Sequence, residues 1–157
     1  MLRICLVVLA SALGACSAGP AFEYRAASLT ETPGSTPAQA PGSSLRVFVQ
    51  PEVVIDDRDV ASAALAKTAG GERAFEIHLT DSGARKLGDY TAAHLDQPIA
   101  IIVDGKLCSA PIVLSPLTKT AMVMGGPGGL SEAEADRLVR SLNRLPPDPG
   151  GRYRRAA

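Results

Sequence analysis

The sequence predicts a single small α+β domain with a largely antiparallel sheet and helices packed on one face. Three observations lead to this prediction: short runs in which apolar and polar residues alternate, longer runs with helical spacing, and an Asp-Gly pair between two apolar runs. The predicted order is strand, helix, strand, helix, hairpin, strand and helix. Such a mixed order is typical of α+β domains.

The first predicted strand and helix lie within residues 45–67. Residues 45–54 contain a short strand with Val47 and Val49 on one side. We expect a helix over 56–67, because acidic residues suit its N-terminus and apolar residues follow at helical spacing. The acidic residues are Asp56, Asp57 and Asp59, and the apolar ones are Val60, Ala61, Ala64 and Leu65.

The next strand and helix are predicted within residues 73–95. Residues 73–80 alternate apolar and polar side chains, which predicts a half-buried strand. Its apolar side carries Phe75, Ile77 and Leu79, and its polar side carries Glu76, His78 and Thr80. Residues 81–95 predict a helix with Asp81 as its N-cap and one apolar face, made of Ala84, Leu87, Thr91 and Leu95.

Residues 98–113 predict a β-hairpin that turns at Asp104-Gly105. This dipeptide between apolar runs is a strong hairpin signal, because glycine adopts the positive φ that a two-residue turn requires. The expected cross-strand pairs are Val103 with Lys106, Ile102 with Leu107, and Ile101 with Cys108. Cys108 would then share a face with Ile99 and Ile101.

The last predicted elements are a strand over 120–126 and a helix over 130–146. Ser131 and Glu134 fit a capping box, and Leu138, Val139 and Leu142 form an apolar stripe. The glycine-rich stretch 125–135 resembles a phosphate-binding loop only superficially. It lacks the Lys-Ser/Thr pair of a P-loop, and its acidic first helical turn would repel an anion, so we expect a plain turn.

Charge and composition exclude some classes of function and limit the number of domains. The chain of 157 residues carries 16 basic and 16 acidic residues and no tryptophan. Its length fits one domain. A balanced charge and few aromatic residues argue against a nucleic-acid partner.

The N-terminus predicts a bacterial lipoprotein. Residues 1–15 contain a basic residue and a ten-residue apolar run, too short to span a bilayer, which indicates a secretory signal. The end of this segment, Leu13-Gly-Ala-Cys16, resembles a lipobox. The resemblance implies cleavage before Cys16 and acylation of its sulfur, and Ser17 implies sorting to the outer membrane if the source is Gram-negative. The alternative is a plain secretory signal with a chance cysteine.

Four segments follow from these observations. Residues 1–15 are the signal peptide, and 16–44 are the lipidated cysteine and a flexible linker rich in Pro, Gly, Ser and Thr. Residues 45–146 form the folded domain. Residues 147–157 are expected to be a disordered basic tail.

The sequence offers no positive case for catalysis, metal binding or a cofactor. After removal of the signal and lipidation of Cys16, only Cys108 remains, which rules out an internal disulfide or a thiolate metal site. Cys108 is expected to pack in the core, although a reactive thiol is the alternative. His78 and His94 match no metal-site spacing and are expected on the surface.

The folded part resembles the head subdomain in the first periplasmic region of SecD, an accessory factor of Sec protein translocation. The resemblance covers about residues 46–146, opens with "DRDVASA" at 57–63 and continues through "FEIHLTDSGARKLGDYTAAHLDQPIAIIVDGKLCSAP". Its most specific part is the hairpin pattern Asp-Gly-x-hydrophobic-x-Ser-Ala-Pro. Cys108 stands where the family usually has an aliphatic residue, which favours a packing role.

The resemblance implies a binding module rather than a complete translocase, since the family's membrane-spanning helices are missing after the signal. We expect a lipid-anchored envelope protein facing the periplasm, which contacts unfolded or exported polypeptide or Sec components through the sheet face or the hairpin edge. The alternatives are a structural subunit of an envelope complex and, third, an enzyme that uses Cys108.

Overall fold

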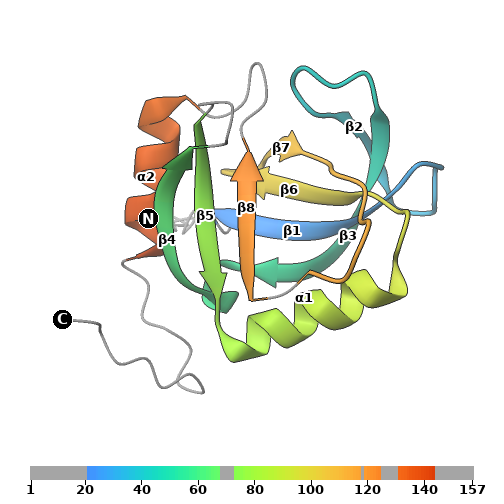
Figure 1. Cartoon of the computed structure of the whole chain (residues 1–157). Helices are drawn as coiled ribbons and strands as arrows, with labels where there is room; N and C mark the ends of the chain where they lie inside the picture. The colour runs from blue at the N-terminus through green and yellow to red at the C-terminus, as the bar shows by residue number, and fades with distance from the viewer. Residues whose placement is uncertain (1–20, 68–72, 118, 125–130, 144–157) are drawn as a thin grey trace, which may run out of the picture.

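A computed structural model describes residues 21–67, 73–117, 119–124 and 131–143. In these residues the strands form two antiparallel sheets that enclose one core, and two helices cover them (Figure 1). The first sheet has the order β2-β3-β1-β6-β7, and the second has the order β4-β5-β8. The predicted α+β class and the antiparallel pairing are confirmed.

The first sheet is built around β1 (Phe22–Ser28), which lies between β3 (Arg46–Asp56) and β6 (Ile99–Val103). The sequence of β1 alternates, so Phe22 and Tyr24 enter the core while Glu23 and Arg25 lie on the opposite face. The edge strands are β2 (Thr36–Gln39) and β7 (Lys106–Ser109).

The predicted flexible linker over 16–44 is therefore wrong in its central part. Residues 22–28 and 36–39 are strands, and the domain does not begin at 45. Burial of Phe22 and Tyr24, together with pairing to a strand on each side, offsets the conformational entropy lost on ordering β1. Residues 1–20 and 144–157 lie outside the described residues, so the predicted signal peptide, the lipidated Cys16 and the basic tail stay predictions.

The predicted helix over 56–67 is also wrong. The acidic residues cap a 3₁₀ turn, η1 (Asp57–Asp59), in which Asp56 and Asp59 form a reciprocal capping box. The chain then forms β4 (Val60–Lys67), which pairs with β5 (Arg73–Leu79). Strand pairing overrides the helix propensity of the alanines, and a bulge after Val60 disguises the strand periodicity.

The strand predicted at 73–80 is confirmed as β5, with Phe75, Ile77 and Leu79 fully buried. The helix that follows is α1 (Asp81–Ala93). Its N-cap is Thr80 rather than Asp81, because the Thr80 hydroxyl accepts the Gly83 N–H at 3.0 Å.

The buried face of α1 is smaller than predicted. Leu87 and Thr91 are buried and Ala84 packs at the edge of the core. The helix ends at Ala93, and Leu95 is 46% exposed. Leu95 therefore does not belong to the apolar stripe that the sequence predicted.

The hairpin is confirmed, with one change of register. Asp104 (φ 48°) and Gly105 (φ 75°) both adopt positive φ, the signature of a type I′ turn. Val103 pairs with Lys106 and Ile102 with Leu107, as predicted. A bulge follows, so Ile101 pairs with Ser109 and not with Cys108.

The strand predicted at 120–126 is present as β8 (Thr120–Met124), and the last helix is α2 (Glu132–Leu142). The predicted capping box is present: the Ser131 hydroxyl accepts the Glu134 N–H, and the Glu134 carboxylate accepts the Ser131 N–H. Leu138 and Leu142 enter the core, and Val139 packs against it. No helix in the described residues is long and apolar enough to cross a membrane.

The core lies between the two sheets. The Phe22 ring packs edge-on against Phe75 with centroids 6.1 Å apart, and it also contacts Tyr24 at 5.2 Å. Phe22 comes from the first sheet and Phe75 from the second, so this contact joins the two sheets. Burial raises the pKa of the Tyr24 hydroxyl far above its ordinary value.

Candidate binding surface of the first sheet

The first sheet has two ends that differ in composition. At the near end β1 starts, β3 and β6 finish and β7 starts; its residues are Ala21, Asp57, Arg58, Asp104, Gly105 and Lys106. At the far end β1 finishes and β3 and β6 start; its residues are Leu29, Leu45, Leu95 and Leu114. The antiparallel register places these two groups at opposite ends of the strands.

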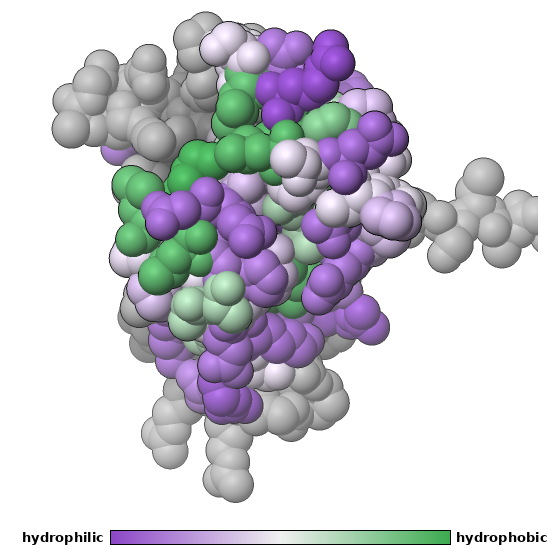
Figure 2. Space-filling view, turned by 90° about the vertical axis from the view of Figure 1, so that its right-hand side faces the viewer, coloured by the Kyte–Doolittle hydropathy of each residue, from purple (hydrophilic) through white to green (hydrophobic). Residues whose placement is uncertain are grey.

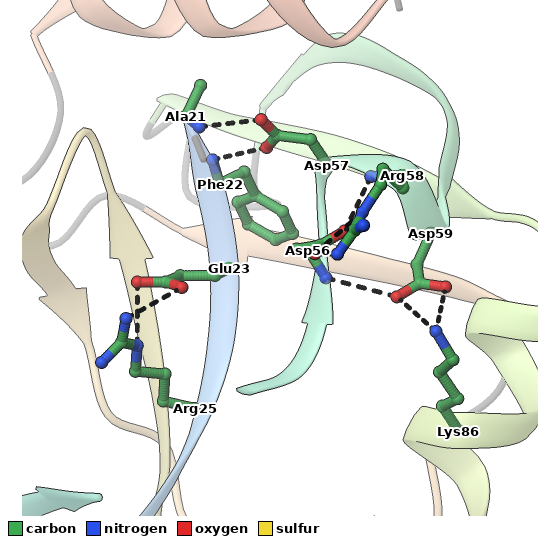
Figure 3. A network of polar contacts seen from close by, with 9 residues as sticks. All are labelled: Ala21, Phe22, Glu23, Arg25, Asp56, Asp57, Arg58, Asp59 and Lys86. Carbon is green, nitrogen blue, oxygen red and sulfur yellow. Dashed lines mark hydrogen bonds and ion pairs between the residues drawn. The ribbon is translucent and has the colours of Figure 1, made fainter. Parts of the chain in front are cut away.

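The near end is held by carboxylates (Figure 3). Asp57 accepts the N–H groups of Ala21 and Phe22 at 2.8 and 2.7 Å. Asp59, which is buried, accepts two hydrogen bonds from the Lys86 ammonium, at 2.8 and 3.1 Å. These aspartates therefore serve as backbone acceptors, caps and ion-pair partners.

Burial raises the pKa of the Asp57 carboxyl, and the two backbone N–H donors only partly oppose that shift. The pKa of the Asp56 carboxyl moves the other way, because the Arg58 side chain donates hydrogen bonds to it. The arrangement holds the start of β1 and offers no carboxylate pair poised for acid–base catalysis.

The far end exposes apolar side chains. Leu114 is 81% exposed, and Leu29, Leu45 and Leu95 are each more than a third exposed. Leu95 and Leu114 adjoin the backbone bond in which Asp96 N–H donates to Val113 O at 2.8 Å, so they are neighbours. Figure 2 faces the side of the molecule on which β1 finishes and shows apolar residues gathered beside hydrophilic ones. Grouped exposed leucines favour contact with another macromolecule.

A hollow of about 270 Å³ lies on the face of the first sheet opposite the core. Its apolar lining includes Val49, Ile102 and Leu107, and its polar lining includes the side chains of Arg25, Thr36 and Gln50. Gly34, Ala38, Pro51 and Gly105 complete it. The volume lies below the usual range of small-molecule pockets, about 300–1,000 Å³. An apolar floor with a few hydrogen-bonding groups suits a side chain and the adjoining backbone of an extended polypeptide.

Arg25 is oriented by a buried partner. Glu23 is 4% exposed, and it accepts hydrogen bonds from Arg25 Nε at 2.9 Å and Nη2 at 3.2 Å (Figure 3). This two-point contact fixes the guanidinium plane. Because a guanidinium carries five N–H groups and this contact uses two, further donors are left to face the hollow that Arg25 lines.

Both edge strands of the first sheet contribute to the hollow. An edge strand presents unpaired N–H and C=O groups, to which another strand can be added. β7 contains no proline and offers the more complete set of donors, whereas Pro37 removes one donor from β2.

The edge of β4 in the second sheet, unlike the edge of β7, is capped by a side chain. Asn143 Nδ2 donates to Ala63 O, and Asn143 Oδ1 accepts the Ala63 N–H, both at 2.9 Å. One side chain thus imitates a paired strand at this point of β4. The sequence predicted contacts through the sheet face or the hairpin edge. On the first sheet the hollow lies on that face and β7 is that edge, and their role in binding stays a prediction.

Cys108 is half-buried and packs against the core. Its thiol lies 3.6 Å from Lys106 O, and burial raises the pKa of the Cys108 thiol. A raised pKa leaves less thiolate, which is the reactive form. The geometry favours the packing role over the reactive one, although the bulge in β7 places Cys108 at the margin of the core.

His78 lies on the surface, as predicted, whereas His94 is partly buried. The His78 side chain is 47% exposed and lies 3.6 Å from the Glu76 carboxylate. His94 stacks on Tyr90 with ring centroids 4.0 Å apart, and its Nδ1 contacts Tyr90 O at 2.7 Å. Within the described residues, no group of three or more His, Cys, Asp or Glu side chains could hold a metal ion.

The strand order and the two helices define a small α+β domain. The profile of the family "SecDF, P1 head subdomain" matches residues 32–144, and the chain belongs to this family. The match starts before the region in which the sequence alone suggested the resemblance, and it includes β2.

Curated relatives agree with this assignment. Protein translocase subunit SecD of Rhodobacter capsulatus is 32% identical over 93 residues, which are 59% of this chain and 17% of the relative. Protein translocase subunit SecDF of Thermus thermophilus is 27% identical over 88 residues, 56% of this chain and 12% of the relative. The chain thus spans less than a fifth of these relatives.

Solved structures share the fold. A structure of the membrane component SecDF that enhances protein export superposes with a TM-score of 0.59 at 17% identity, over 78% of this chain and 61% of that one. SecDF in its super-membrane-facing form gives the same TM-score at 20% identity, over 78% of this chain and 18% of that one.

Sequence reasoning missed part of this surface. Arg25 and Thr36 fall in the segment predicted to be a linker, so two of the three polar side chains that line the hollow were overlooked. Glu23, which orients Arg25, lies in the same segment. The alternation Phe-Glu-Tyr-Arg-Ala at 22–26 was the signal that could have identified β1.

Proposed function

We propose that this protein is a lipid-anchored module of the cell envelope, facing the periplasm, that binds extended segments of exported polypeptide. The segment would add to the edge of β7 and place one apolar side chain in the hollow. The observation that carries this proposal is an amphipathic hollow beside an edge strand, in a chain of the SecDF head family. The proposed role is to hold chains, without the translocase activity of the much longer relatives.

The chemistry of the hollow supports this ligand. Val49, Ile102 and Leu107 would contact an aliphatic side chain, and burial of such a side chain contributes about 1.5–3 kcal/mol. The backbone of the ligand needs hydrogen-bond partners, which β7, Arg25 and Gln50 can supply. A ligand of varied sequence is expected, because main-chain bonds do not depend on side-chain identity.

A peptide-binding measurement tests the proposal. Fluorescence anisotropy with labelled, unstructured peptides derived from exported proteins should show saturable binding. Leu107→Asp, which places a charge in the hollow, should weaken binding at least about tenfold, or 1.4 kcal/mol. The matched control is Leu65→Asp on β4, since Leu65 is exposed and lies outside the hollow. Equal affinities of the two variants, or no binding by the wild type, would contradict the proposal.

The anchor is proposed from residues 1–17. The apolar segment followed by Leu-Gly-Ala-Cys16 supports cleavage and acylation at Cys16, and Ser17 supports outer-membrane sorting in a Gram-negative cell. Metabolic labelling with palmitate should mark the wild type and leave Cys16→Ser unmarked. A labelled Cys16→Ser variant, or an unlabelled wild type, would contradict acylation at this cysteine.

A fixed envelope partner is the second candidate, favoured by the exposed leucines of the far end. Crosslinking in intact cells followed by mass spectrometry separates the two functions. Many unrelated exported proteins, or Sec components, would support chain holding. One partner in constant ratio, lost in Leu114→Asp and retained in Leu107→Asp, would support a structural subunit instead.

A further inference from the structure

The distance along the chain between the proposed anchor and the folded body is short. Cys16 and Ala21 are five positions apart. Five residues span at most about 18 Å, even when fully extended. The surface around Ala21 is therefore restricted to a thin layer above the membrane, whatever conformation the connecting residues adopt.

The chain enters the folded body at a fixed point. Asp57 accepts both the Ala21 and the Phe22 N–H (Figure 3). Ala21 O accepts the Asp104 N–H at 3.0 Å. Phe22 is fully buried. These contacts tie the first described residue to the turn after β6 and to η1, so the strand cannot supply extra length to the tether without breaking them.

The two ends of the sheet are far enough apart to lie at measurably different distances from the membrane. The seven residues of β1 span about 23 Å at ~3.3 Å per residue. The exposed side chains of the near end are hydrophilic, namely Arg58, Asp104 and Lys106. Among the described residues, four exposed leucines lie at the far end of the sheet. A hydrophilic surface suits contact with lipid headgroups without insertion into the acyl chains.

We propose that the near end faces the lipid headgroups of the membrane, so that the far end, with its leucines, projects away from the bilayer. This inference rests on the proposed acylation of Cys16. The five-residue tether supplies the proximity, and the Asp57 contacts supply the orientation. The hollow then lies along the side of a domain that stands upright on the membrane.

Site-directed quenching tests the orientation on the full-length acylated protein in vesicles of phosphatidylethanolamine and phosphatidylglycerol. A fluorophore is attached to Lys106→Cys at the near end or to Glu31→Cys at the far end, each in a Cys108→Val background. Both positions are exposed. A headgroup-bound, short-range quencher should quench the near-end label at least about threefold more than the far-end label.

A lengthened tether is the control. A Gly/Ser insertion of about 24 residues between Ala18 and Gly19 adds a root-mean-square length of about 27 Å, so the two labels should become quenched alike. Equal quenching in the protein without insertion would overturn the orientation alone. A wild-type protein that carries no acyl group on Cys16 when it is purified from cell membranes would overturn the proposed anchor, and with it the orientation. Mass spectrometry of the N-terminal peptide distinguishes these results.

Discussion

The near and far ends of the first sheet are built by the same strands, yet their chemistry differs. At the near end, a partly buried carboxylate binds two backbone N–H groups and fixes the start of β1. At the far end, four leucines are exposed to solvent. The near end uses its polar groups to hold the fold, whereas the far end leaves apolar surface exposed to solvent. This difference favours the far end over the near end as a surface that contacts another protein.

The largest expected effect is on the free energy of unfolding, when an apolar side chain is removed at each end of the sheet. Phe22→Ala should lower the free energy of unfolding by about 3–5 kcal/mol, because it leaves a cavity where the two sheets meet. Leu29→Ala should change it by less than about 0.5 kcal/mol, since Leu29 is half exposed. Urea denaturation gives both values. Equal effects would mean that β1 is not part of the core.

The second test concerns the carboxylate at the near end. Asp57→Ala should destabilise the fold by about 1–3 kcal/mol, because the N–H groups of Ala21 and Phe22 lose their acceptor. Its control is Glu31→Ala, which removes an exposed carboxylate near the far end. Hydrogen exchange of the Phe22 amide should accelerate in Asp57→Ala and stay unchanged in Glu31→Ala. Unchanged exchange in both variants would exclude a role for Asp57 at the start of β1.

The third test uses the half-buried cysteine next to the near end. Cys108→Val should cost less than about 1.5 kcal/mol, because valine is apolar and of similar size. Peptide affinity should remain within about twofold. Complete loss of binding or of cellular function in a folded Cys108→Val protein would instead indicate a reactive thiol.

The smallest expected effect is the pH dependence contributed by Asp57. The folded-state pKa of its carboxyl is raised above the ordinary value of 3.8. Between these two values the folded state binds more protons than the unfolded state, so this carboxyl makes stability fall as pH rises through the window. Asp57→Asn should remove this decrease of stability with rising pH. The separate loss of stability at lower pH should remain, because Asp56, whose pKa is lowered, contributes to it. Urea midpoints of the wild type and of Asp57→Asn, from just below pH 3.8 to neutrality, measure this pH dependence. Parallel profiles of the two proteins would contradict the prediction.

Local patterns in the sequence predicted the hairpin, β5, β8 and both helices. The Asp104-Gly105 turn needs only the backbone freedom of two residues, and the Ser131–Glu134 capping box needs only neighbours along the chain. The resemblance to the SecD head depended on the same hairpin. These features are determined locally, so the sequence was sufficient for them.

The tertiary structure decided the assignments of 22–28 and 60–67. The short alternation of β1 stands in a segment whose composition is typical of a linker, and β4 contains alanines that favour a helix; pairing with distant strands determined both. The hollow could not be predicted either, since it joins Arg25, Val49 and Leu107 from three separate strands. Strand pairing and burial act between residues far apart in the chain, and their energies exceed the local preferences that a sequence pattern reports.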